Sequence, residues 1–350
     1  MIKKVGLLLL SLSCSLSALD PVRCVYPVVA TTVNNEPLLL VLDQQSLQAM
    51  RLWSFNPTSG ESGMALMFIY SPYSINLLPS GNGFSFINNG CIRVKEFLKR
   101  SARALNFYEP IYHITQAQWL DDQTCYFSAK QDGRYKIFTS DIDEELAVLV
   151  DQDGADCVYP SAVQNAIYFL TKDRKQSTCL MSVEVESGHA QELFVFGKKN
   201  VAFLQMVSST EGFYVETPFV INTEDDLLQL QYCRVCKDGG SWRQEQLFSF
   251  QLPMHYIFGS GPERFFESIM PFLPRVYPKE ILFSSMRGSY LDIFSFDRQT
   301  GVSAPAIEEQ RDTDRFGALM FQEKVFYGTS FREETDFEML PLIEWYPKRK

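Results

Sequence analysis

The sequence contains very little of what most catalytic and metal sites are made of. Only three histidines occur in 350 residues, His113, His189 and His255, and no second histidine stands at metal-ligand spacing from any of them. There is no Gly-x-Ser-x-Gly elbow, no Gly-rich phosphate loop and no His-Glu-x-x-His segment. We therefore predict no catalytic, cofactor-binding or metal-binding residue and assign the histidines structural roles. These absences leave open an enzyme that assembles its site from loops distant in sequence.

Two further shortages narrow the class of protein. Basic residues are outnumbered, with 32 Lys and Arg against 42 Asp and Glu and a formal net charge of −10, which argues against nucleic acid as a partner because phosphate binding needs clustered cations. After the N-terminus no segment reaches the roughly 18 uninterrupted apolar residues of a transmembrane helix. Hydrophobic residues nevertheless make up 46% of the chain, and 28 Phe and 16 Tyr favour strands.

The N-terminus has the layout of a secretory signal peptide. Lys3 and Lys4 precede an apolar run from Val5 to Leu12, and small residues follow up to Ala18. We place cleavage near Ala18, so residues 1–18 are expected to be removed from an exported protein. The periplasm, the cell envelope and the exterior all remain open.

A lipid-attachment signal is an alternative interpretation of the same region. Leu12-Ser13-Cys14 is partly similar to a lipobox, although Ser11 stands where that signal prefers leucine. On this interpretation Cys14 would carry a lipid anchor.

A fourteen-residue spacing repeats along the chain. The segments 127–141 (FSAKQDGRYKIFTSD) and 283–297 (FSSMRGSYLDIFSFD) both begin with Phe-Ser, contain Ile-Phe ten positions later and end on Asp. Related units, each with a strand followed by a Gly turn, begin near Leu52 and Leu180. Weaker candidates are 83–97, 212–235 and 324–342. About seven units at a period of about 46 residues fit four-stranded propeller blades.

The sequence thus predicts an all-β fold over residues 19–350, a single β-propeller domain of about seven four-stranded blades, with six or eight as alternatives. The first strand, Val25 to Thr32, is expected to complete the last blade near Phe337 to Trp345 and so close the ring. Only Val94 to Leu105 has enough helix formers to suggest a short helix, and an outer blade strand would have a similar sequence.

One unit resembles a known family. The unit has, in order, an aromatic residue, an Asp-containing turn, a Phe-Ser strand, a Gly turn and an Ile-Phe strand that ends on Asp; the residues are Gln118–Asp122, Cys125–Ser128, Asp132-Gly133, Ile137-Phe138 and Asp141. This order resembles a blade of the TolB-type β-propellers. The resemblance is strongest at 113–149 and 274–308. It implies blade architecture and carries over no functional residue.

Eight cysteines invite a chemical interpretation. Cys233-Arg234-Val235-Cys236 has redox or zinc spacing, but it ends a predicted strand rather than opening a helix, and no second pair exists. We interpret it as buried thiols or structural disulfides. Loss of Cys14 with the signal peptide leaves an odd number of cysteines, which implies at least one free thiol or an intermolecular disulfide. Cys125 and Cys179 lie in predicted core strands and fit as small apolar side chains.

Two charged clusters have a functional and a structural interpretation. The run 151–156 (DQDGAD) is similar to part of a calcium loop, but it lacks a third alternating carboxylate and a final Glu, so we favour an acidic loop between blades. A basic cluster could face an anionic surface, yet such runs are usually solvated; its members are Arg93, Lys95, Lys99, Arg100 and Arg103.

Three functions follow as hypotheses. The first is a non-catalytic binding or scaffold propeller whose loops on one ring face hold a protein, peptide or glycan, and it rests on fold-level analogy. The second is a propeller hydrolase or lyase with a central-channel site, which carboxylates converging on His113 or His189 would favour. The third is a lipid-tethered structural component of the envelope.

Overall fold

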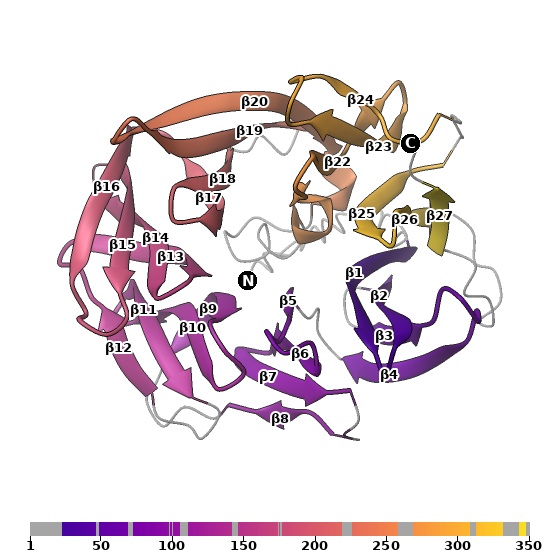
Figure 1. Ribbon diagram of the computed structural model, residues 1–350, viewed down its shortest axis with the longest axis horizontal. Helices are drawn as coiled ribbons and strands as arrows, with labels where there is room; N and C mark the ends of the chain where they lie inside the picture. Colours follow the sequence, from indigo (N-terminus) through magenta and orange to yellow (C-terminus); the bar gives the residue numbers. More distant parts are fainter. Residues whose placement is uncertain are drawn as a thin grey trace, which may run out of the picture.

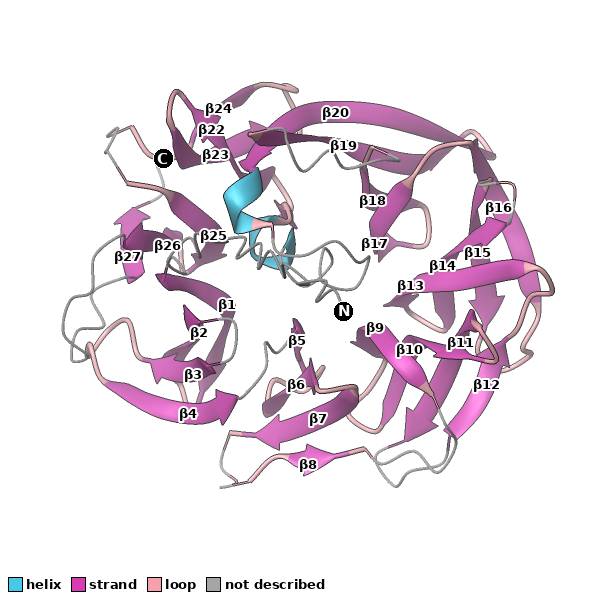
Figure 2. Cartoon of the chain, turned by 180° about the vertical axis from the view of Figure 1, so that it is seen from behind, coloured by secondary structure: helices cyan, strands magenta, loops and turns pink. Residues whose placement is uncertain are grey.

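The chain folds into a ring of antiparallel β-sheets (Figure 1). The computed structural model describes residues 23–46, 49–68, 73–97, 99, 101–105, 111–141, 146–173, 175, 177–218, 226–257, 269–308, 313–331 and 343–347. Consecutive strands pair with one another as meanders, so each sheet is built from a short stretch of chain. Two 3-10 helices, η1 (Met254–Tyr256) and η2 (Met270–Phe272), lie on the inner side of the ring (Figure 2).

The strands group into seven meanders in chain order. The first four contain β1 (Arg23–Val33), β2 (Glu36–Ser46), β3 (Ala49–Phe55) and β4 (Ser62–Phe68); β5 (Tyr73–Leu77), β6 (Gly83–Asn88), β7 (Cys91–Glu96) and β8 (Arg103–Ala104); β9 (Tyr112–Trp119), β10 (Thr124–Gln131), β11 (Arg134–Asp141) and β12 (Leu146–Val150); and β13 (Ala155–Val163), β14 (Ala166–Asp173), β15 (Thr178–Glu184) and β16 (Ala190–Gly197).

The remaining three follow the same order. They contain β17 (Val201–Ser208), β18 (Glu211–Glu216), β19 (Leu227–Asp238) and β20 (Ser241–Pro253); β21 (Arg275–Val276), β22 (Glu280–Arg287), β23 (Tyr290–Asp297) and β24 (Ser303–Pro305); and β25 (Arg315–Phe321), β26 (Lys324–Phe331) and β27 (Ile343–Pro347). By continuous hydrogen bonding these strands form six sheets, five of them four-stranded. The sixth has seven strands because it joins the first meander to the last. The predicted all-β propeller with four-stranded blades is confirmed.

The sequence repeat corresponds to the hairpin formed by the second and third strands of a meander. In β10 and β11, Phe127 lies opposite Phe138 with ring centroids 5.6 Å apart. In β22 and β23, Phe283 lies opposite Phe294, again at 5.6 Å. The repeated aromatic positions are therefore cross-strand neighbours, whose stacking stabilises the hairpin.

The suggested helix between Val94 and Leu105 is wrong, and its alternative, an outer strand, is confirmed. Residues 103–104 form β8, which pairs with β7 at Arg93 and Val94. Val94 belongs to β7, and the backbone pairing of 103–104 with it makes this segment the outer strand of the second meander. Tertiary packing has overridden the local helix propensity.

Ring closure differs from the expected arrangement. β1 pairs along most of its length with β2, and it meets the last meander through two residue pairs, Arg23 with Phe331 and Cys24 with Ser330 of β26. The first strand is thus the inner strand of the first meander and does not form the outer strand of the last. Residues 337–342 of the expected partner segment lie outside the described residues, and β27 pairs with β26.

A guanidinium joins the first meander to the sixth. Arg275 of β21 donates from Nη1 to the carbonyl of Val28 at 2.9 Å and from Nη2 to the carbonyl of Pro27 at 3.2 Å. The ladder between β1 and β2 is irregular between Pro27 and Val29, so a bulge presents these carbonyls to the arginine. Burial lowers the pKa of Arg275.

The inner strands share a second irregularity. Positive φ angles near 50–65° occur in the strands that begin five of the meanders, next to register shifts; the residues are Ser74, His113, Tyr159, Phe203 and Gly317. Residues other than Gly rarely adopt this conformation. A bulge of this kind bends the strand and increases its twist where it faces the ring centre.

Hydroxyl groups connect neighbouring meanders at a regular interval. The amide N–H groups of Ala117, Met206 and Met320 donate to side-chain oxygens of the preceding meander, at 3.1 Å, 2.9 Å and 2.8 Å; the acceptors are Ser74 Oγ, Ser161 Oγ and Tyr277 Oη. Each acceptor gives a partner to an N–H that would otherwise be left unbonded at a sheet edge. The apolar core fills the spaces between meanders as several clusters.

Buried charges hold η1 and the last meander against the sixth. Arg315, 1% exposed, donates to Asp292 Oδ1 at 3.1 Å, and Arg287 donates to Asp292 Oδ2 at the same distance. Tyr256 of η1 donates to Asp314, which also accepts from a backbone amide of β23. The acids are paired, as buried charges must be, so this network has a structural explanation.

Candidate functional site

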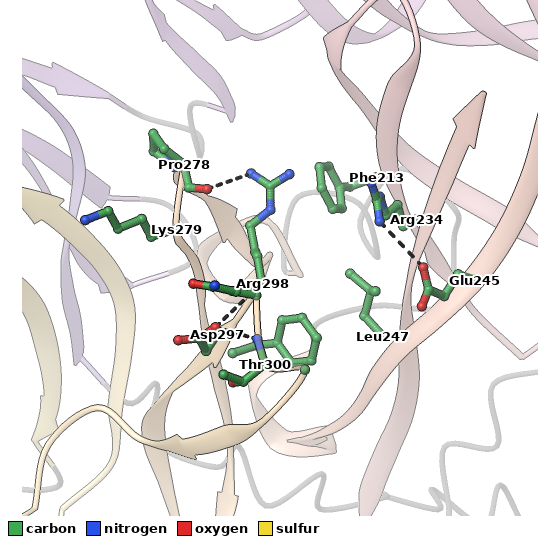
Figure 3. Close-up of a pocket in the computed structure, with 12 residues that line it drawn as sticks. Phe213, Arg234, Glu245, Leu247, Pro278, Lys279, Asp297, Arg298 and Thr300 are labelled. Atoms are coloured by element: carbon green, nitrogen blue, oxygen red, sulfur yellow. Dashed lines mark hydrogen bonds and ion pairs between the residues drawn. The ribbon is translucent and has the colours of Figure 1, made fainter. Parts of the chain in front are cut away.

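A cleft of about 620 Å³ separates the fifth meander from the sixth. One wall comes from β18, β19 and β20, and the other from the turns before β22 and after β23 (Figure 3). Its lining residues are Phe213, Arg234, Glu245, Leu247, Pro278, Lys279, Phe296 and residues 297–301. Because it combines apolar side chains with a few charged groups, the cleft is a candidate ligand site.

The wall from the sixth meander is a rigid turn at the end of β23. Asp297 Oδ1 accepts the amide N–H groups of Gln299 and Thr300, both at 2.8 Å, and the Gly301 amide donates to the Asp297 carbonyl at 2.9 Å. These amides lower the pKa of the Asp297 carboxyl. Gly301 has a φ of 72°, a conformation that glycine adopts without strain.

The same turn occurs at two other places in the ring. In the first meander Asn56 Oδ1 accepts the amides of Thr58 and Ser59, and Gly60 closes the turn. In the fourth, the Gly188 amide donates to the Glu184 carbonyl. Asp297 is thus a turn residue as well as a cleft residue.

Arg298 crosses the base of the cleft. Its Nη2 donates to both carboxylate oxygens of Glu211 in the fifth meander, at 2.9 Å and 3.0 Å, and its Nη1 donates to the carbonyls of Tyr277 and Pro278. The guanidinium also lies over the ring of Phe213, 5.2 Å from its centroid. Since Nη2 binds the fifth meander while Nη1 binds carbonyls of the sixth, Arg298 holds the two walls in register.

Arg234 brings a second cation to the same carboxylate. Its Nε lies 2.7 Å from Glu211 Oε1, and its Nη1 lies 3.7 Å from Glu245 Oε2. Glu211 is thus shared by two arginines, and the three cations of the site are matched by three carboxylates, Glu211, Glu245 and Asp297. Within the described part of the chain, Arg234 Nη2 and the exposed Lys279 ammonium have no bonded partner. The cleft can therefore offer donors next to apolar surface.

The histidines do not converge on a site. His113 lies in the bulge of β9, while His189 is an exposed residue of the turn between β15 and β16. His255 belongs to η1, and its side chain lies outside the described residues. Among the described residues no group of three or more His, Cys, Asp or Glu side chains is arranged to hold a metal ion.

Six cysteines are free thiols, and four of these are buried; the six are Cys91, Cys125, Cys157, Cys179, Cys233 and Cys236. Cys233 and Cys236 are 2% and 5% exposed in β19, which fits the interpretation as buried thiols rather than a redox pair. Burial raises the pKa of Cys233 to about 11 and that of Cys157 to about 12. Such thiols carry almost no thiolate at neutral pH. Cys14 lies outside the described residues.

The acidic run 151–156 serves as a loop between meanders. Asp151 Oδ2 lies 2.9 Å from Lys136 Nζ, Asp153 lies 3.7 Å from Arg134, and Asp156 accepts the amide of Tyr135 at 2.9 Å. Its carboxylates are thus engaged by cations and backbone of the third meander, as the structural interpretation predicted.

The basic cluster does not form one cationic surface among the residues described. Lys95, 7% exposed, donates to the carbonyls of Glu96 and Lys99, and burial lowers its pKa. Lys99 pairs with Glu96 at 2.5 Å. Arg100 lies outside the described residues.

Lys172 is a further cation with a lowered pKa. It donates to Asn200 Oδ1 at 3.2 Å and lies over the Tyr159 ring, 5.6 Å from the centroid. Burial lowers the pKa of Lys172 to about 8, against the opposing effect of Asp156. Because these contacts join the fourth meander to the fifth, we treat it as a structural lysine.

Sequence reasoning missed the cleft. Its residues come from six places between Phe213 and Gly301, and only the turn was visible as a pattern. Arg298 follows the repeated Asp297 directly, where the first meander has Pro57. That departure from the repeat was the available signal.

Comparison with known proteins gives the fold but no close relative. No family model matches the chain, and no curated protein matches it. TolB from Acinetobacter baumannii is similar with a TM-score of 0.51 and 11% identity, over 81% of this chain and 62% of that one. The TolB-type propeller resemblance is confirmed at the level of fold.

Enzymes share this fold as well. An oligogalacturonate lyase in complex with manganese is similar with a TM-score of 0.55 and 5% identity, over 88% of this chain and 93% of that one. A puromycin-hydrolyzing peptidase of Mycobacterium tuberculosis matches with a TM-score of 0.55 and 9% identity, over 89% of this chain and 49% of that one. The chain thus spans less than two thirds of that TolB and about half of the peptidase. No helix in the described part is long and apolar enough to cross a membrane.

Proposed function

We propose that this protein is an exported, non-catalytic binding propeller that holds a peptide or protein segment in the cleft between its fifth and sixth meanders. Export rests on the signal-peptide layout of residues 1–18. The observation that supports binding is the cleft itself, in which Arg298 and Glu211 fix two walls around apolar surface. A preorganised site of this kind loses little entropy when it binds.

The lining favours a segment that carries an apolar side chain next to a carboxylate. Leu247 offers apolar contact beside the largely buried rings of Phe213 and Phe296, and Arg234 and Lys279 offer charged donors. Arginine suits a carboxylate because its donors match the two oxygens. Glycans remain the alternative ligand class, since aromatic and polar groups also suit sugars.

Selection of peptides from a random library against the purified chain tests this proposal. The binding of selected peptides is measured by fluorescence anisotropy with wild type, Thr300→Arg and Ser59→Arg. Thr300 and Ser59 occupy the same position in the same turn, but only Thr300 lines the cleft. We expect Thr300→Arg to weaken binding at least tenfold and Ser59→Arg to leave it unchanged.

Three outcomes would count against the proposal. Equal binding by both variants would place the ligand elsewhere, and selection of no peptide would contradict a peptide-binding function. Cleavage of selected peptides, detected by mass spectrometry, would support the alternative hydrolase instead. Radiolabelled fatty acid incorporated at Cys14 would support the lipid-tethered alternative.

A further inference from the structure

The outer edge of the first meander is unlike the other outer edges of the ring. β4 pairs with β3 on one side and ends the seven-stranded sheet. Its seven residues, SGMALMF, contain no charge and no proline. A long uncharged edge strand presents unpaired N–H and C=O groups to any other strand, and proteins usually protect such edges.

The other outer strands carry that protection or are too short to need it. β8 has 2 residues and β24 has 3, with Pro305 at its end. β16 contains Glu192, β20 contains Arg243 and Glu245, and β27 contains Glu344 and a proline. β12 is uncharged but has only 5 residues. β4 therefore combines length and neutrality as none of these does.

The exposed side chains of β4 gather on one face. Met64 is 54% exposed and Met67 66% exposed. Met64 lies opposite Trp53 of β3, and Met67 lies opposite Arg51. Trp53 and Arg51 are two residues apart and share one face of the sheet. A bulge at Ala65 shifts the register, so Met64 and Met67 lie on that same face. Leu66 and Phe68 point to the other face and pack into the core. Two flexible thioethers thus form an apolar patch beside an open edge.

We propose that β4 is a self-association edge, where a second copy of this chain adds its own β4 in antiparallel pairing. Residues directly opposite each other in an antiparallel pair share a face, so the register that fits β4 places Met67 of one copy opposite Met64 of the other. The two exposed thioethers of each copy then contact those of its partner on the same face. The strand is thus complementary to itself.

The net charge of the chain limits the surfaces through which two copies can associate. Each chain carries a formal −10, so two copies repel over most of their surfaces. A seven-residue strand without charge is an element through which they can meet. Pairing of two short strands buries less than the roughly 1,000 Å² of a tight interface, so we expect a dissociation constant in the micromolar range.

Sedimentation of the purified chain between about 1 and 200 µM tests the proposal. Wild type is expected to change from monomer to dimer, and Met67→Lys to raise the dissociation constant at least tenfold, because a charge at this position blocks the edge. Val148→Lys in β12 is the matched control, because Val148 also belongs to an uncharged outer strand and is 44% exposed. This replacement is expected to leave the dissociation constant unchanged.

A cross-link tests the register. A mixture of Met64→Cys and Met67→Cys chains places the two new thiols opposite each other, and mild oxidation is expected to give a covalent dimer that neither variant forms alone. A wild-type monomer at 200 µM would overturn the proposal. So would a dimer that is indifferent to Met67→Lys, or a mixture that fails to cross-link, since the dimer would then form through another face. None of these outcomes depends on the peptide cleft.

Discussion

Replacing Arg275 with methionine should loosen the closure of the ring. Arg275 connects the inner strand of the sixth meander to the bulge of β1, across a sequence separation of 247 residues. Methionine retains most of the apolar stem but cannot donate to the carbonyls of Pro27 and Val28. The first meander would then be held to the last by the two residue pairs between β1 and β26 and by apolar packing.

The size of the effect follows from the two hydrogen bonds. Their lengths, 2.9 Å and 3.2 Å, are those of well-formed bonds. A hydrogen bond to a charged group contributes about 1.5–3 kcal/mol. The desolvation that lowers the pKa of Arg275 opposes this gain. We expect the free energy of unfolding to fall by about 3 kcal/mol, since both carbonyls lose their partner.

Urea unfolding, followed by tryptophan fluorescence, measures this change, and hydrogen exchange locates it. Amides of β1 should exchange faster in Arg275→Met, whereas those of β14 and β15 should not. Arg243→Met is the control: its ion pair with Asp238, at 3.3 Å, is 61% exposed on the arginine side, so its loss should leave the free energy of unfolding unchanged. If Arg275→Met matches this control and β1 exchanges as in wild type, the arginine does not close the ring.

Three other predictions follow from buried polar groups. The pKa of Lys172 is lowered from 10.5 to about 8, so between these pH values the unfolded chain binds more protons than the folded chain. The free energy of unfolding of wild type should therefore rise between pH 8 and 10.5, by about 2 kcal/mol relative to Lys172→Met. Ser161→Ala leaves the amide of Met206 without its acceptor and should cost about 1–2 kcal/mol in urea unfolding. Cys157 and Cys233, with pKa values raised to about 12 and 11, should react with a disulfide reagent at pH 8 only after unfolding.

Each of these has a control on the surface. Lys175→Met removes an exposed lysine and should show no change in pH dependence across the same window. Ser249→Ala, at an exposed position of β20, should change stability by less than about 0.5 kcal/mol. Rapid labelling of Cys157 or Cys233 in the native chain would show that these strands open readily, contrary to their burial.

The hairpins were the predictable part of this fold. Phe127 and Phe138 are cross-strand neighbours, and their spacing is fixed by the turn between them, so a local pattern encodes a local contact. The same holds for the turns at Asn56 and Asp297, where a side-chain oxygen binds amides two and three residues on. Repeats of such units imply a ring because each must cover the next.

Contacts between meanders could not be predicted in the same way. The acceptor for Arg275 lies 247 residues away, and the bulge that presents it leaves no composition signal. The positive φ angles at Tyr159 and Phe203 oppose local preference, so only packing around the ring explains them. The cleft depends on how two meanders sit side by side, a property that neither meander's sequence contains alone.

Positions that differ between copies of the repeat can carry a function beyond the fold itself. In three meanders a turn of the same form follows the third strand, and its second residue is Pro57, Val185 or Arg298. The amides of Val185 and Arg298 make the same bond, to the carbonyls of Asn165 and Lys279. The backbone is thus alike while the side chains differ, and in this set only Arg298 reaches a carboxylate of the neighbouring meander. Since the turn needs no arginine to form, the pair with Glu211 is better explained by the cleft it supports than by the architecture it shares.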